Sequence, residues 1–121
     1  MTSIYQELIL DHYRNPRNQG ILKEPTHEAS ANNPTCGDKL SMQILEKNGI
    51  IESVKFTGSG CAISQASASI LTESLVGKSI EEAKNLKKED LLELLGIELS
   101  LTRLKCALLA LDTLKKALKK N

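Results

Sequence analysis

The 121-residue chain has very few aromatic side chains. It contains no tryptophan, a single phenylalanine (Phe56) and two tyrosines (Tyr5 and Tyr13). A hydrophobic core must therefore be built mainly from leucine, isoleucine, valine and alanine. A chain of this length can bury roughly two thirds of its unfolded surface, so it needs no disulfides to fold. We expect one domain over residues 1–121.

Long apolar runs and an excess of charge of one sign are also missing. No stretch approaches the roughly 18 apolar residues of a membrane helix, and the N-terminus lacks the pattern of a signal peptide. The 16 basic and 15 acidic side chains leave a formal net charge of +1, which does not indicate a nucleic-acid-binding surface. Four lysines near the C-terminus are interpreted as a solvated helix face: Lys115, Lys116, Lys119 and Lys120. These absences predict a cytoplasmic protein with no membrane or nucleic-acid partner.

Cysteine is scarce as well, and its number is odd. The three cysteines are Cys36, Cys61 and Cys106, and without a secretion signal they do not indicate a disulfide framework. Each one stands beside a glycine turn or near an expected helix start. Together with Asp38, three thiolates and one carboxylate form a complete ligand set for a tetrahedral metal ion. The cysteines lie too far apart for a zinc finger, so the tertiary fold would have to gather them.

The periodicity of apolar residues predicts an α+β protein. We expect a helix that ends before Asn15-Pro16, a mostly extended or looped segment over 16–35 with a short strand near 29–31, and then an antiparallel hairpin. The hairpin turns at Asn48-Gly49, and its second strand directs Ile50, Val54 and Phe56 to one face, with Glu52 as an exception. Helices are expected over 61–76, 79–86 and 88–95, and from about residue 102 to the C-terminus.

The candidate ligands each have a plainer alternative. If Cys36-Gly37-Asp38 is extended, Cys36 and Asp38 point to the same side; otherwise they are a turn cysteine and a solvated aspartate. Cys61 falls at the first turn of a helix, where the helix dipole favours a thiolate, or it is a small buried hydrophobe.

Cys106 and the two histidines complete the candidates. With Thr102 as N-cap, Cys106 lies about one turn into the last helix, near the cations Arg103 and Lys105, unless it is an edge-of-core cysteine. His12 and His27 are rival ligands, although a surface or half-buried role is typical of such residues.

Four segments together resemble a known family. They are residues 11–18 (DHYRNPRN), 33–38 (NPTCGD), 56–69 (FTGSGCAISQASAS) and 103–107 (RLKCA). In order and over nearly the whole chain, they resemble the U-type iron–sulfur assembly family, which includes IscU, SufU and the N-terminal domain of NifU. The resemblance implies a small antiparallel sheet with helices packed mainly on one face. It also implies that Cys36, Cys61 and Cys106 are the functional cysteines and that Asp38 is the fourth ligand.

The residues around Cys106 separate two branches of that family. The scaffold branch usually has histidine before the last cysteine and a proline-rich chaperone-recognition segment ahead of it. This chain has Lys105 there and no proline over 97–102. Its RxKC pattern resembles the SufU branch, although it lacks most of the insertion that this branch usually carries between the second and third cysteines. Resemblance to SufU implies zinc binding and a pyridoxal-phosphate-dependent cysteine desulfurase as partner.

Two functional hypotheses follow for the same four residues. In the first, zinc is held by Cys36, Asp38, Cys61 and Cys106, and Cys36 accepts sulfur from the desulfurase. In the second, the four residues hold a labile [2Fe–2S] cluster that is assembled here and passed to client or carrier proteins. A purely structural zinc domain is the third interpretation, which the glycines around Cys36 and Cys61 disfavour.

Overall fold

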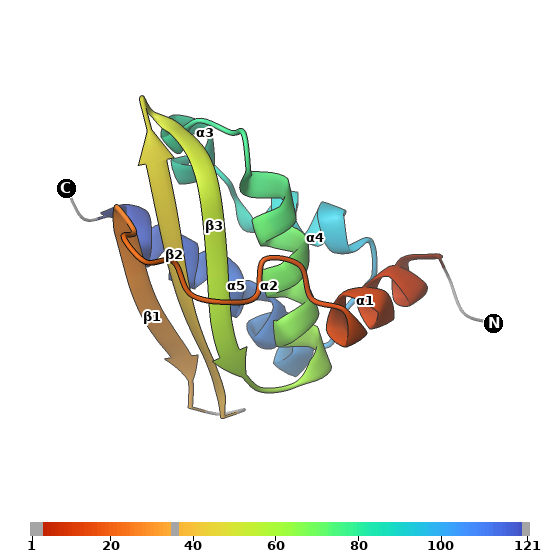
Figure 1. The fold of residues 1–121 in the computed structure, drawn as a ribbon. Helices are drawn as coiled ribbons and strands as arrows, with labels where there is room; N and C mark the ends of the chain where they lie inside the picture. The colour runs from red at the N-terminus through yellow and green to blue at the C-terminus, as the bar shows by residue number, and fades with distance from the viewer. Residues whose placement is uncertain (1–3, 35–36, 120–121) are drawn as a thin grey trace.

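The structure is a computed structural model that describes residues 4–34 and 37–119 (Figure 1). One helix precedes three strands, and four helices follow them. The elements are α1 (Ile4–Arg14), β1 (His27–Asn33), β2 (Asp38–Lys47), β3 (Ile50–Ser59), α2 (Ala62–Leu75), α3 (Ile80–Lys84), α4 (Lys88–Leu95) and α5 (Leu101–Lys119). This order confirms the α+β prediction.

The three strands form one antiparallel sheet in the order β1-β2-β3. β2 and β3 are joined at Asn48 and Gly49, whose φ angles are 55° and 81°. Positive φ at both central residues is what a type I′ turn requires, so the hairpin prediction is confirmed. The short strand expected near 29–31 is part of the longer β1.

The predicted inward face of β3 is wrong at its first residue. Val54 and Phe56 are buried as expected, but Ile50 is 43% exposed and Ile51 is fully buried. The pairing shifts between Leu45 and Glu46, so the strand carries an extra residue at this point. A bulge of this kind reverses which side chains face the core. The prediction from Ile50 assumed strict alternation along the whole strand and therefore placed this residue on the wrong face.

The helices lie mainly on one face of the sheet, as the family resemblance implied (Figure 1). α2 packs on β3, α5 packs on β1 and β2, and α1 and α4 pack on α2 from the outside. The segment after α1 returns along the edge of β3. There Gly20 N–H donates to Phe56 O and Phe56 N–H donates to Asn18 O, both at 2.9 Å. This edge of the sheet is therefore paired rather than open.

The small residues of α2 allow close packing on all sides. Ser67, Ser69 and Thr72 are fully buried in the middle of the molecule. Each hydroxyl is hydrogen-bonded, as buried polar groups require; Ser67 Oγ, for example, donates to Ala107 O on α5 at 2.7 Å. This bond ties α2 to α5 one residue beyond Cys106.

The last helix starts slightly earlier than predicted. α5 begins at Leu101, and the Oγ of Ser100 accepts a hydrogen bond from Arg103 N–H at 3.3 Å. Ser100, rather than Thr102, therefore occupies the capping position, because its hydroxyl reaches an amide of the first turn. Cys106 then lies in the second turn of α5.

Lysines near the end of α5 do more than solvate a helix face. Lys116 Nζ donates to Ser30 O of β1 at 2.8 Å, and Lys115 Nζ donates to Lys84 O at the end of α3. Both contacts lie at the surface, which agrees with a solvated helix face, and they also tie α5 to main-chain carbonyls of other elements. Lys120 lies outside the described residues.

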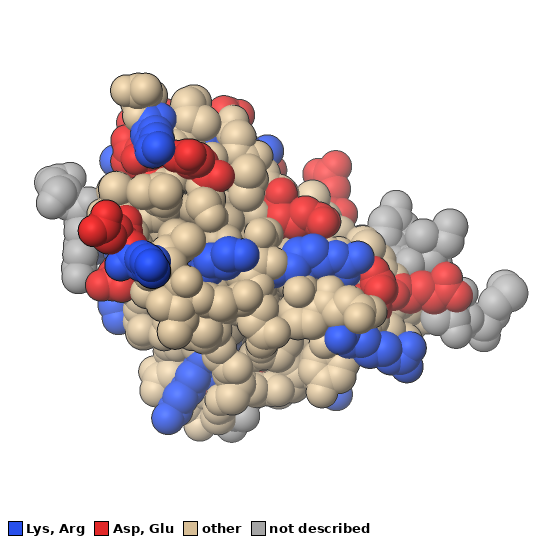
Figure 2. Space-filling view, in the orientation of Figure 1, with Lys and Arg blue, Asp and Glu red and all other residues tan. Residues whose placement is uncertain are grey.

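Charged side chains of both signs are interspersed on the face of the molecule shown in Figure 2. This arrangement agrees with the formal net charge of +1. Within residues 4–34 and 37–119, every helix is too short or too polar to span a bilayer.

Candidate metal centre

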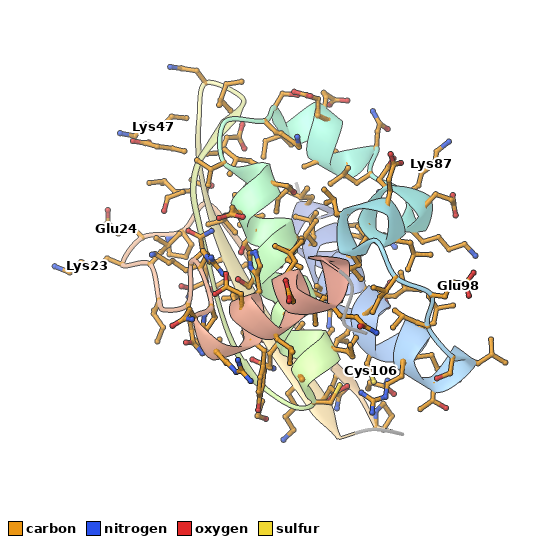
Figure 3. All side chains as sticks on the ribbon, turned by 90° about the vertical axis from the view of Figure 1, so that its right-hand side faces the viewer. Lys23, Glu24, Lys47, Lys87, Glu98 and Cys106 are labelled. Carbon is orange, nitrogen blue, oxygen red and sulfur yellow. The ribbon has the colours of Figure 1, made fainter. Side chains whose placement is uncertain are left out.

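Three of the four predicted ligands meet at one end of the sheet. Asp38 is the first residue of β2, Cys61 directly precedes α2, and Cys106 lies on α5. Figure 1 shows this end at the bottom, where β3 leads into α2, and Figure 3 labels Cys106 beside the start of α2. One ligand atom from each of the three residues lies within 4.8 Å of the other two.

Asp38 is the most constrained member of the group. Its side chain is fully buried, and its Oδ1 accepts a hydrogen bond from the backbone N–H of Cys61 at 2.9 Å. The other oxygen, Oδ2, lies 4.0 Å from Cys61 Sγ. One carboxylate oxygen is therefore bound to the main chain, while the second lies near the sulfur of Cys61. The alternative of a solvated aspartate is wrong.

Cys61 is the N-cap residue of α2, with φ −74° and ψ 167°. Its side chain makes no capping hydrogen bond to the helix; its sulfur faces Asp38 instead. The side chain is half-buried, which does not fit the alternative of a small core hydrophobe. The N-terminal end of α2 carries a partial positive charge that favours anionic groups nearby. This end of the helix is therefore a suitable place for a carboxylate and thiolates.

Cys106 is buried, with 2% of its surface exposed. Its neighbours Arg103 and Lys105 are both exposed to solvent. The structure buries Cys106 where α5 packs against α2. Burial and the sulfur's proximity to Asp38 and Cys61 are compatible with a ligand.

The three donors fit a single tetrahedral ion. With Zn–S bonds of about 2.3 Å and a Zn–O bond of about 2.1 Å, tetrahedral angles place donor atoms about 3.6–3.8 Å apart. The distances in the structure, 4.0 Å between Asp38 Oδ2 and Cys61 Sγ and at most 4.8 Å within the group, need only a modest contraction. In a [2Fe–2S] cluster each iron takes two protein ligands, so three such ligands would be divided between two irons. The short distances between the three donor atoms therefore favour binding of a single ion. The fourth coordination position of that ion is then available to another ligand.

Cys36, the fourth predicted ligand, lies outside the described residues. Gly37 beside it has a φ of 73°, and its N–H donates to Asn33 O at 2.8 Å. Of the two alternatives for Cys36-Gly37-Asp38, the extended one is not met at Gly37, because the chain turns there between β1 and β2.

The two histidines are bound elsewhere. His27 is half-buried, as predicted, with Nε2 2.7 Å from Glu46 Oε1. His12 is only 2% exposed, so the expectation of a surface or half-buried residue is wrong. Its Nδ1 lies 2.7 Å from Ser69 Oγ on α2, and burial lowers the pKa of its imidazole. Among the described residues, the group of Asp38, Cys61 and Cys106 includes neither histidine.

Sequence reasoning missed the contact between His12 and Ser69. A helical period indicates that both residues lie on helices, but not that the two helices cross at these positions. Ser69 Oγ also accepts the N–H of Arg17 at 2.8 Å, so this hydroxyl joins α2 to both α1 and the segment that follows it.

Comparison with known proteins agrees with the sequence and the fold. The family model described as the NifU-like N terminal domain matches residues 4–121. The chain is 36% identical to the zinc-dependent sulfurtransferase SufU of Bacillus subtilis, in a match that covers 100% of this chain and 93% of that protein. This match extends over 138 positions, so gaps fall within the present 121-residue chain, consistent with a missing insertion. The chain is also 41% identical to the iron–sulfur cluster assembly scaffold protein IscU of Haemophilus influenzae, in a match that covers 94% of this chain and 92% of that protein.

Solved structures show the same fold. A putative iron–sulfur cluster assembly scaffold protein for the SUF system from Fervidobacterium islandicum superimposes with a TM-score of 0.79 at 29% identity, covering 93% of this chain and 94% of that one. A NifU-like N-terminal protein from Brucella abortus gives a TM-score of 0.76 at 18% identity, covering 96% and 92%. The second similarity concerns the fold alone.

Proposed function

Because this chain belongs to the NifU-like N-terminal domain family, we propose that it works in iron–sulfur cluster biogenesis. Its role is that of a zinc-bound sulfur acceptor, which takes persulfide sulfur from a pyridoxal-phosphate-dependent cysteine desulfurase. The observation that carries this proposal is the convergence of Asp38, Cys61 and Cys106, whose donor atoms lie within 4.8 Å of one another. The 36% identical relative, SufU, is a zinc-dependent sulfurtransferase, which supports the same chemistry.

Cys36 is the proposed fourth ligand and the sulfur acceptor. It lies two positions before Asp38, and covalent geometry keeps Cα atoms at that separation within about 7 Å. Zinc bound by these residues would keep the thiols deprotonated and protected until the partner arrives. Gly37, which already adopts a turn conformation, adds no side chain that would hinder the approach of a partner's persulfide to Cys36.

The proposed transfer is redox-neutral. The thiolate of Cys36 attacks the terminal sulfur of the desulfurase persulfide, and a new S–S bond forms on Cys36. The S–S bond of the desulfurase breaks at the same time, and its electron pair leaves on the desulfurase cysteine as a thiolate. Asp38, Cys61 and Cys106 hold the site together during this exchange.

Lys105 favours the acceptor over the scaffold. It is exposed and stands next to Cys106, where the scaffold branch usually has histidine. A protonated lysine has three donors and no lone pair, so it cannot ligate a metal ion. The site then depends on thiolates and one carboxylate alone, which suits zinc.

A [2Fe–2S] scaffold is the second candidate, because the chain is 41% identical to an IscU scaffold protein. A carboxylate is a poorer ligand than a thiolate for an iron–sulfur cluster, so Asp38 would make such a cluster labile. Client or carrier proteins would then be the partners that receive it.

Metal analysis combined with a sulfur-acceptance assay tests the proposal. The purified chain is expected to hold about one zinc per molecule and to gain the mass of sulfur after incubation with a desulfurase and cysteine. Cys36→Ala should abolish this gain, while Asp38→Ala, which keeps all three thiols, should alter zinc retention. A chain that binds no zinc would contradict the proposal, and Cys36→Ala protein that still accepts sulfur would transfer the acceptor role to Cys61 or Cys106.

Anaerobic reconstitution with iron and sulfide separates the two candidates. The acceptor hypothesis predicts that zinc-loaded protein develops little visible absorbance, whereas a scaffold acquires the bands of a [2Fe–2S] cluster and transfers it to an apo-ferredoxin. Formation of a transferable cluster without detectable sulfur acceptance would favour the scaffold.

A further inference from the structure

We propose that Gly60 is a positioning residue of the metal centre, because the absence of a side chain there leaves room for the Asp38 carboxylate. In this position Asp38 offers only Oδ2 to the metal ion, while Oδ1 stays on the amide of Cys61. This inference rests on the proposed function insofar as the site binds zinc, and it concerns how the ligand is held rather than sulfur transfer.

The carboxylate of Asp38 lies directly against the backbone of Gly60. A Cβ atom added to Gly60 would come within 2.8 Å of Asp38 Cγ and still closer to Oδ1, and it would lie 2.9 Å from Ser64 Oγ. Real Cβ atoms essentially never approach other heavy atoms so closely. Asp38 is fully buried at the first position of β2, so its side chain cannot move away from Gly60 into solvent without leaving the site.

The hydrogen bond from Cys61 fixes which oxygen faces the ligands. The N–H of Cys61 donates to Oδ1 at 2.9 Å, on the side of the carboxylate that packs against Gly60. Oδ2 is the oxygen that lies near Cys61 Sγ, at 4.0 Å. Because Oδ1 is directed at the Cys61 amide and packs against Gly60, whereas Oδ2 lies near the sulfur, Oδ2 is the oxygen that is placed to bind the ion.

Backbone conformation alone does not explain this glycine. Gly60 has a φ of 148°, a value that L side chains rarely adopt. Gly77, after α2, also has a positive φ, of 92°, but an added Cβ there would meet no atom within 4 Å. Gly77→Ala therefore also places an alanine at a strained positive φ but without a collision, which makes it the control for Gly60→Ala.

A thermodynamic cycle on zinc affinity tests the positioning role. Zinc dissociation constants are measured by chelator competition for the wild-type chain, Gly60→Ala, Asp38→Ala and the double variant, with circular dichroism to verify folding. Outer-shell partners of metal ligands typically contribute about 10–100-fold to metal affinity, so Gly60→Ala should weaken zinc binding by that amount. In the Asp38→Ala background the same change should have an effect below about twofold, because the carboxylate that it displaces is gone. Gly77→Ala should leave the affinity unchanged.

The cobalt(II) spectrum supplies a second readout that a general loss of stability does not move. In cobalt-loaded protein, Gly60→Ala should shift the d–d bands in the same direction as Asp38→Ala does, because both remove the same oxygen ligand. The positioning role would be overturned if Gly60→Ala lowered zinc affinity equally in the wild-type and Asp38→Ala backgrounds. A cobalt spectrum of Gly60→Ala protein identical to that of wild type would also overturn it.

Asp38→Asn tests the single-oxygen assignment in a variant of nearly unchanged shape. The Cys61 N–H needs an acceptor, so the amide oxygen takes the place of Oδ1 and the NH₂ group faces the metal ion, where it cannot ligate. Asp38→Asn should therefore bind zinc as weakly as Asp38→Ala. An affinity close to wild type would overturn the assignment. If the wild-type chain binds no zinc, the proposed function fails; if it binds zinc and the cycle is additive, only the role of Gly60 fails.

Discussion

Two buried polar clusters in this molecule differ in how their hydrogen-bonding groups are balanced. Between α1 and α2, the Nδ1 of His12 and the N–H of Arg17 both meet the hydroxyl of Ser69, at 2.7 and 2.8 Å. At the end of the sheet, Asp38 is fully buried with one backbone N–H on Oδ1, and Oδ2 faces sulfur.

The comparison shows how a polar cluster that joins helices differs from one that can bind a metal ion. A serine hydroxyl both donates and accepts, so it satisfies the histidine and the amide without any added group. A carboxylate and thiolates are acceptors and electron-pair donors, and the strongest partner that such a set can take is a cation. The first cluster therefore joins two helices, and the second is suited to a metal ion.

The largest expected effect comes from removing two ligands. Cys61→Ser/Cys106→Ser should lose its bound zinc, because a serine hydroxyl is a poor zinc ligand. At a free zinc concentration about 1,000-fold above the dissociation constant, binding should stabilise the wild-type chain by about 4 kcal/mol. Denaturant unfolding in zinc buffers measures the difference, and the double variant should show no such stabilisation. Equal stabilisation of both proteins would mean that zinc binds elsewhere.

Removing the shared hydroxyl should have a smaller effect and spare the metal centre. Ser69→Ala leaves His12 and the N–H of Arg17 without their partner in a buried site, which should lower the free energy of unfolding by about 1–3 kcal/mol. Ser74→Ala is the control, because the half-buried Ser74 hydroxyl bonds only a carbonyl of its own helix, Leu71 O. Denaturant unfolding of both variants checks the difference. A loss of zinc affinity in Ser69→Ala would show that the two clusters are coupled.

Acid should weaken the helix-joining cluster through His12. Burial holds the pKa of His12 below its ordinary value of 6.5, and Arg17 acts in the same direction, whereas Glu73 and Asp11 oppose it. The unfolded chain then binds more protons than the folded chain, so this contribution to stability is lost as pH falls below 6.5 and is unaffected above it. Unfolding of metal-free protein between pH 7.5 and 5, about the range in which histidine titrates, should show a steeper loss for wild type than for His12→Asn. Parallel profiles would assign the acid sensitivity to other groups.

The smallest expected effect belongs to an exposed polar contact. Lys116 Nζ binds Ser30 O at 2.8 Å on the surface, where water can replace either partner. Lys116→Met should lower the free energy of unfolding by about 0.5 kcal/mol, measured by denaturant unfolding, and Lys116→Arg should restore most of it. A loss as large as that of Ser69→Ala would show that burial is not what separates the two contacts.

Local sequence signals predicted most of the elements correctly. The Asn48-Gly49 turn and the helices expected over 79–86 and 88–95 each depend on a few neighbouring residues, and the structure contains all three. There Ser79 and Glu82 form a capping box at the start of α3, and Gly96 ends α4. The errors arose where partners from other elements decide the outcome. Ile50 turned outward because the pairing of β2 and β3 contains a bulge, and His12 was buried because α1 lies across α2.

The candidate site shows the same division. The types of residue, three cysteines and an aspartate beside glycines, predicted a set of four ligands, and the structure brings three of them together: Asp38, Cys61 and Cys106. Their sequence separations could not show that Asp38 is fully buried, that its Oδ1 accepts the Cys61 amide, or that Gly60 packs against its carboxylate.

By itself, the sequence determined which chemistry is available, because side-chain types and short-range turn and capping preferences are local properties of the chain. Only the tertiary structure decided which of these groups meet and in what orientation, because contacts between β2, α2 and α5 depend on how whole elements pack. Asp38, Cys61 and Cys106 converge for this reason: three packed elements begin near the same place.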